Sequence, residues 1–107
     1  MNSLNSVLLE GNLAADPLDL SCDGILTCVF TLLVKRFYHV GLETSSEISR
    51  FRIKAYGNLA KLCLSDYKKA SSLRIVGRLI EYRSEDEDGS HHSHVYILAE
   101  HIEHIGH

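Results

Sequence analysis

The sequence predicts an all-β domain with one helix, closed into a five-stranded Greek-key barrel. Five segments carry the β-branched and aromatic residues that strands prefer, and turn residues separate them. One segment of helical period lies between the third and fourth of these segments. The chain has 107 residues, enough for one domain with one modest core, and we expect residues 1–107 to form it.

The first half of the chain supplies three strands. The first covers about residues 5–13 and is followed by a turn at Asp16-Pro17. A second turn at Asp23-Gly24 precedes a long strand rich in Val, Ile, Leu, Thr and Phe, whose pattern runs past ten residues. We expect a polar connection at 41–47 and a third strand at 48–56.

The helix is predicted from a change of period after the third strand. Apolar residues recur at helical spacing from Leu59 to Tyr67, and Asn58 is the expected N-cap. Ala70 stands where a helix-terminating glycine is usual. We therefore expect one short helix that ends before this alanine.

Two strands complete the barrel, at about 71–83 and 93–105, and a hairpin tip at 85–89 joins them. Gly77 lies in mid-strand, where a glycine is typical of a sharp bend at a barrel corner. Five strands with a helix between the third and the fourth are the element order of an OB-fold.

Composition narrows the class of protein. The chain is 45% hydrophobic and 23% charged, as soluble globular domains are. No run approaches the length of a membrane span, and the N-terminus lacks the features of a signal peptide. We therefore expect a cytoplasmic, nucleoid-associated protein without a membrane partner. The three cysteines are interpreted as reduced and mostly buried thiols.

No catalytic or metal site is predicted. The sequence shows no phosphate-binding glycine loop, no activated nucleophile and no paired carboxylates, so we expect neither an enzyme nor a cofactor. The acidic run from Glu85 to Asp88 is interpreted as a solvated hairpin tip. Imidazoles are common zinc ligands, but those of this chain have no carboxylate or cysteine at a ligand spacing: His91, His92, His94, His101, His104 and His107.

Charge is distributed unevenly along the chain. The net charge is −3, but residues 35–78 hold ten Lys or Arg against three Asp or Glu, and the remainder is strongly acidic. Within the third strand, Arg50, Arg52 and Lys54 alternate with apolar residues, and Tyr56 follows in the same phase. Alternate side chains of a strand point to opposite faces. One face of the strand should therefore be buried. The other should be cationic and end in an aromatic ring, which suits an anionic partner with planar groups.

Four motifs resemble those of bacterial single-stranded DNA-binding proteins. They occur in the same order as in that family and together span the domain: SVLLEGNLAADP, FRIKAYGNLAKLC, LRIVGRL and DGSHHSHVYILAEHIE. The resemblance implies sequence-independent binding and protection of single-stranded DNA in replication, recombination and repair. It also implies a homotetramer, or at least a dimer, and two chains are expected to join through the first strand.

The resemblance also implies which residues contact DNA. The family's second-strand aromatic falls at Tyr38, or at Phe37 if the register slips by one, and the aromatic before the helix falls at Tyr56. Where the family often has another aromatic, this chain has Arg50, and it contains no Trp. The full predicted DNA-binding set is Lys35, Arg36, Phe37, Tyr38, Arg50, Arg52, Lys54, Tyr56, Arg74, Arg78, Tyr82 and Arg83. Arg74 and Arg78 share strand phase with Tyr82, which favours one continuous surface.

Two alternatives remain open from the sequence. Family members typically carry a flexible segment with an acidic tail that recruits replication and repair proteins, whereas this chain ends at HIEHIGH. We therefore expect no tail-mediated recruitment and leave replication and repair proteins open as partners. A tail-less OB-fold paralogue could instead act as a primosomal protein or as an adapter for an acidic protein partner.

Overall fold

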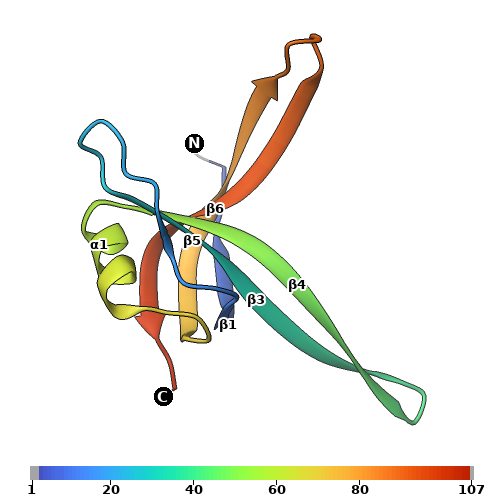
Figure 1. The fold of residues 1–107 in the computed structure, drawn as a ribbon. Helices are drawn as coiled ribbons and strands as arrows, with labels where there is room; N and C mark the ends of the chain where they lie inside the picture. Colours follow the sequence, from blue (N-terminus) through green and yellow to red (C-terminus); the bar gives the residue numbers. More distant parts are fainter. Residues whose placement is uncertain (1–2, 107) are drawn as a thin grey trace.

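The computed structural model of the protein describes residues 3–106, so His107 lies outside the described residues. Five strands form the barrel, a two-residue strand lies at its edge and one helix covers one end (Figure 1). In chain order they are β1 (Val7–Leu13), β2 (Leu18–Asp19), β3 (Thr27–Val40), β4 (Glu43–Tyr56), α1 (Gly57–Asp66), β5 (Ser72–Glu85) and β6 (His91–His104).

The barrel closes in the order β1-β5-β6-β4-β3, with β2 appended to β3. β1 pairs with β5 along most of its length and with β3 only at Asn12 and Leu13, which closes the ring. β4 and β6 form the parallel pair, through Ile53↔Ile97 and the following residues. The predicted five-stranded barrel, with its helix between the third and fourth barrel strands, is confirmed.

Two long hairpins extend from the barrel in different directions (Figure 1). We call the distal part of the β3–β4 hairpin, residues 35–48, the first arm, and the distal part of the β5–β6 hairpin, residues 80–96, the second arm. The last six residues of β3 are all exposed. The apolar core therefore ends where the arms begin, and the arms are held mainly by their own backbone pairing.

The core lies inside the barrel and under the helix. Leu32, Ile53 and Ile75 are fully buried within it, and α1 contributes Ala60 and Cys63. A hydrogen bond with the Cys28 thiol and, after it, burial raise the pKa of Cys63, so this thiol stays protonated. Among the described residues no helix is long and apolar enough to cross a membrane.

Three predicted boundaries were wrong, for local reasons. The segment 41–47 is mostly strand, because β4 begins at Glu43 and pairs with β3 out to Val40. A hairpin arm that is exposed on both faces has no alternation of apolar and polar residues. Its polar sequence therefore led to the prediction of a loop. Asn58 is not the N-cap: that position is Tyr56, and no side chain caps the helix. β5 and β6 also reach two residues further into their hairpin than predicted, to Glu85 and from His91.

Two small residues occupy positions with special backbone requirements. The pairing of β5 with β6 shifts register between Val76 and Gly77, as the predicted barrel corner requires. A Cβ atom at Gly77 would overlap the carbonyl oxygen of Leu98. Ala70 has a φ of 75°, a left-handed conformation that glycine adopts freely and that strains an alanine.

Candidate nucleic-acid interface

The outward side of β4 carries the cations that the sequence predicted there. Ile53 and Ala55 are fully buried, whereas Arg50 and Arg52 are exposed and Lys54 is half-buried. The predicted alternation between a buried and a cationic side is therefore confirmed. We call the outward side of the sheet, on which these cations lie, the outer face.

β3 extends this face onto the first arm. The antiparallel register pairs Arg50 with Leu33 and continues to Lys35 and Phe37, so these side chains share the outer face. The Lys35 Nζ atom lies 4.9 Å from the centre of the Phe37 ring. Of the two aromatic positions left open by the sequence, Phe37 is therefore the one on the cationic side, and it is 64% exposed.

Arg36 and Tyr38 point to the opposite side of the same arm. They alternate with Lys35 and Phe37 along β3, and Arg36 lies opposite Glu47. The Arg36 Nη1 atom is 3.9 Å from a Glu47 carboxylate oxygen, and both side chains are mostly exposed. These two predicted residues are thus separated from the outer face by the thickness of the hairpin.

Two tyrosine rings lie beside Lys54 where the barrel meets the second arm, and a third tyrosine is a neighbour of one of them. We call Tyr56, Tyr82 and Tyr96 the tyrosine cluster. The Lys54 Nζ atom lies 4.5 Å from the Tyr96 ring centre and 5.8 Å from that of Tyr82. The Tyr82 and Tyr96 rings are tilted at 53°, with their centres 5.9 Å apart. The cluster offers aromatic surface beside a cation, and Tyr56 and Tyr82 are each about two-fifths exposed.

Tyr96 was missed by the sequence reasoning. Burial raises the pKa of its phenol, and the neighbouring Tyr56 and Tyr82 raise it further, while Arg78 acts in the opposite direction. Its outward orientation could have been predicted, because it is adjacent in the strand to the buried Ile97 and neighbouring side chains point to opposite faces. Nothing in the sequence showed that β6 would bring it beside Lys54 of β4, since that contact depends on the parallel pairing of these strands.

The cations of β5 fall into two groups. Arg78 is exposed and pairs in register with Leu98, which itself pairs with Lys54, so it extends the outer face. Arg74 is engaged elsewhere: it lies 2.6 Å from Glu10 on β1 and 3.5 Å from Glu103 on β6, and the contact with Glu10 raises its pKa.

Arg83 differs from its neighbour Tyr82 in orientation. It alternates with Tyr82 along β5, and its Nε atom lies 3.1 Å from Glu81, which shares its side of the arm. The sequence predicted one continuous surface from Arg74 through Arg78 to Tyr82. The carboxylates around Arg74 neutralise one end of it, so Arg78 is its one unpaired cation among the described residues.

Five outer-face cations have no carboxylate within ion-pair distance among residues 3–106. We call them the cationic track: Lys35, Arg50, Arg52, Lys54 and Arg78. The track runs from the first arm across β4 to the tyrosine cluster. A chain in which acidic residues outnumber basic ones thus presents one side with unneutralised positive charge. Such a surface attracts polyanions.

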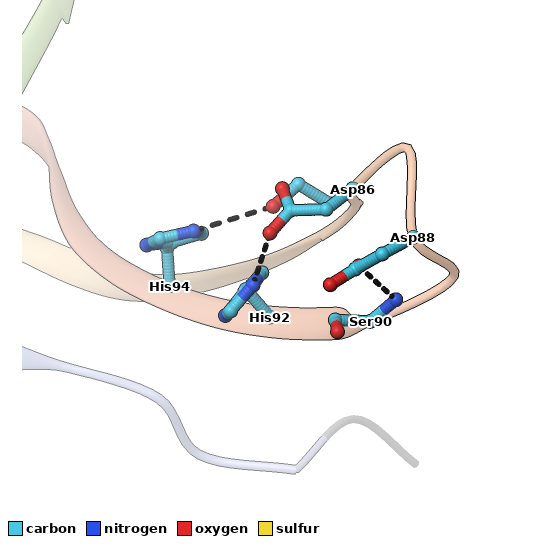
Figure 2. Close-up of polar contacts among 6 residues, drawn as sticks. Asp86, Asp88, Ser90, His92 and His94 are labelled. Atoms are coloured by element: carbon cyan, nitrogen blue, oxygen red, sulfur yellow. Dashed lines mark hydrogen bonds and ion pairs between the residues drawn. The ribbon is translucent and has the colours of Figure 1, made fainter.

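The tip of the second arm is acidic and rich in histidine. Figure 2 shows His92 directed toward Asp86, with 2.6 Å between the imidazole Nε2 and a carboxylate oxygen. His94 stacks on Tyr82 at a ring distance of 4.9 Å and lies 3.3 Å from the Ser84 hydroxyl. Within the part of the chain that the structure describes, no three His, Cys, Asp or Glu side chains are grouped as a metal site would require.

Comparisons with known proteins identify the family of the chain. Residues 4–105 match the single-strand binding protein family. The single-stranded DNA-binding protein of Aquifex aeolicus is 33% identical over 101 residues, which are 92% of this chain and 68% of that protein.

Two solved structures share the OB-fold. A Plasmodium falciparum SSB in complex with ssDNA superposes with a TM-score of 0.88 at 18% identity, covering 99% of this chain and 98% of that one. A small single-stranded DNA-binding protein from Streptomyces coelicolor gives a TM-score of 0.77 at 22% identity, covering 98% and 96%. Sequence match and fold together show that this chain belongs to the single-strand binding protein family.

Proposed function

We propose that this chain binds single-stranded DNA without reading its sequence and protects it during replication, recombination and repair. The observation that carries the proposal is the cationic track, which ends at a cluster of partly exposed tyrosines. Family membership supports it, because the relative from Aquifex aeolicus bears the name of this activity. The cytoplasm, where such DNA is found, is the location that we propose.

The mechanism needs no catalytic group. Phosphates of the strand lie along the cationic track, and bases stack on Phe37, Tyr56, Tyr82 and Tyr96. Stacking on an aromatic contributes about 1–3 kcal/mol per base and tolerates every base, since each has a π-face. Duplex DNA hides those faces inside its helix, so the same surface should discriminate strongly in favour of single strands.

A fluorescence-anisotropy titration tests the proposal. Labelled oligo-dT should bind tightly at about 50 mM salt, and a duplex of the same length should bind far more weakly. Tyr56→Ala should reduce oligo-dT affinity at least about fivefold, which corresponds to 1 kcal/mol of lost stacking. Failure of the unmodified chain to bind oligo-dT would contradict the proposal and favour an adapter for an acidic protein partner.

The first arm offers a matched pair of variants. Phe37→Ala removes an aromatic from the outer face, while Tyr38→Ala removes one from the other side of the same strand. We expect the first variant to weaken oligo-dT binding and the second to leave it nearly unchanged. Equal losses would contradict the assignment of the binding surface to the outer face.

We further propose that the chain self-associates through β1, as a homotetramer or a dimer. Residues Val7–Gly11 pair with β5 on one side only, so their other backbone edge is free within the described chain. Leu8 on this strand is 66% exposed. An unpaired strand edge with exposed apolar side chains favours pairing with another copy. Sedimentation equilibrium at micromolar concentration tests this, and a monomer would contradict it.

A further inference from the structure

Two Asp-Gly pairs lie in turns of this chain, and the structure holds their reactive groups differently. Asp23-Gly24 lies in the connection from β2 to β3, and Asp88-Gly89 lies at the tip of the second arm. We propose that Asp23 is a site of spontaneous isomerisation to isoaspartate, and that Asp88 is protected from the same reaction. The modification involves neither DNA nor the cationic track and is thus independent of the proposed function.

The reaction needs only the aspartate, the glycine and water. The glycine nitrogen attacks the side-chain carboxyl carbon and forms a C–N bond, while the carboxyl hydroxyl leaves as water with the amide proton. Water then adds to the main-chain carbonyl of the cyclic imide, the bond from that carbon to nitrogen breaks, and a proton returns to nitrogen. The peptide now runs through the side chain, and the mass is unchanged. Glycine favours the attack, because it has no side chain to hinder the nitrogen.

Both reacting groups of the first pair are unrestrained. Cys22 and Ile25 exchange two backbone hydrogen bonds, at 3.2 and 3.0 Å, which leaves Asp23 and Gly24 as the central residues of the turn. Their φ angles are 53° and 77°, as a type I′ turn requires. Among residues 3–106, no hydrogen bond or ion pair engages the Asp23 carboxylate or the Gly24 amide. Both residues are exposed, so water reaches the site.

Both reacting groups of the second pair are engaged. The Ser90 amide donates to a carboxylate oxygen of Asp88 at 2.9 Å (Figure 2). The Gly89 amide donates to the Asp86 carbonyl, also at 2.9 Å. The hydrogen bonds from Ser90 lower the pKa of Asp88, which keeps its carboxylate ionised and therefore resistant to attack. Two hydrogen bonds must thus open before this pair can react.

Isomerisation of the first pair should alter the hairpin and leave the barrel folded. Isoaspartate adds one carbon atom to the backbone of the turn, so Cys22 and Ile25 can no longer exchange both of their hydrogen bonds. The Leu20 amide still donates to the Thr27 carbonyl, and β3 is paired with β4 along its whole length. Because Thr27 pairs with Tyr56, the loosened hairpin would lie beside the tyrosine cluster.

Ageing of the purified chain tests the proposal. After weeks at body temperature and mildly acidic pH, peptide mapping with an isoaspartyl O-methyltransferase and S-adenosylmethionine should find isoaspartate at position 23. Position 88 should contain at least about tenfold less, the order expected when two hydrogen bonds must open. Similar amounts at both positions, or more at position 88, would overturn the proposal.

Unfolding provides the control for sequence effects. In concentrated urea both turns open, and positions 23 and 88 should then form isoaspartate at similar rates. A difference that persisted in urea would come from the neighbouring sequence and not from the folded turns, and it would overturn the proposed cause.

A matched pair of variants gives a second test. Asp23→Asn and Asp88→Asn form the same cyclic imide with loss of ammonia in place of water, so the mass of the chain rises on hydrolysis. Asparagine suits a type I′ turn, and an asparagine at position 88 can still accept the Ser90 amide through its side-chain oxygen. The first variant should deamidate at least about tenfold faster than the second, for the same reason. Equal rates in the two folded variants would overturn the proposal.

Discussion

The salt dependence of DNA binding should report how many cations of this chain contact phosphate. Eight cations were predicted from the sequence to contact DNA, but Arg36, Arg74 and Arg83 lie against carboxylates. The five of the cationic track remain. For single strands the log–log salt slope is about −0.7 per neutralised phosphate, so we expect a slope of about −3.5 per protomer. Affinity should then fall about 100-fold between 50 and 200 mM salt.

A pair of charge-removing variants makes this prediction specific. Arg52→Gln removes one cation of the track and should reduce the slope to about −2.8, so that affinity falls only about 50-fold over the same range. Arg74→Gln removes a cation that Glu10 and Glu103 already neutralise, and it should leave the slope unchanged.

Fluorescence anisotropy with oligo-dT at several KCl concentrations measures these slopes. A slope near −5.6, which corresponds to all eight cations, would refute the assignment, above all if Arg74→Gln lowered it as much as Arg52→Gln. The ion pairs of Arg74 would then have to open when DNA binds.

Two further predictions concern stability. Ala70→Gly should raise the free energy of unfolding by about 0.5–1 kcal/mol, because glycine adopts the left-handed conformation without strain. A thermal melt measures this, and an unchanged or lower midpoint would contradict it. Gly77→Ala should cost about 1–3 kcal/mol in chemical denaturation, since the new Cβ meets the Leu98 carbonyl; a cost near zero would mean that β6 yields easily.

Much of the barrel could be predicted because its pattern is local. β4 shows this best, since Ile53 and Ala55 are buried and alternate with outward cations, as period-two side chains must be. Two special backbone positions were also visible in the sequence. A glycine in mid-strand indicated the register shift at Gly77, and Ala70 stands where a helix-terminating glycine is usual. The outer ends of the arms lacked such a pattern, so residues 43–47 were expected to be a loop.

The candidate site was predicted only in part, because charge neutralisation and ring contacts depend on pairing between distant strands. Arg74 looked as free as Arg78 in the sequence, yet Glu10 and Glu103 flank it from β1 and β6. Tyr96 joins Lys54 only through the parallel pairing of β4 with β6. Neither contact leaves a signal within a short stretch of residues.

The first arm carries part of the proposed binding surface but almost none of the apolar core. Residues 35–40 are exposed throughout and contribute little to the core, so most substitutions there should change stability by less than about 0.5 kcal/mol. Such positions can vary under selection for affinity alone, with little risk of unfolding the barrel. A laboratory library that randomises Lys35, Phe37 and His39 should therefore yield mostly folded proteins with a wide range of affinities. The domain could in this way be adapted to other extended polyanions while its core sequence is left unchanged.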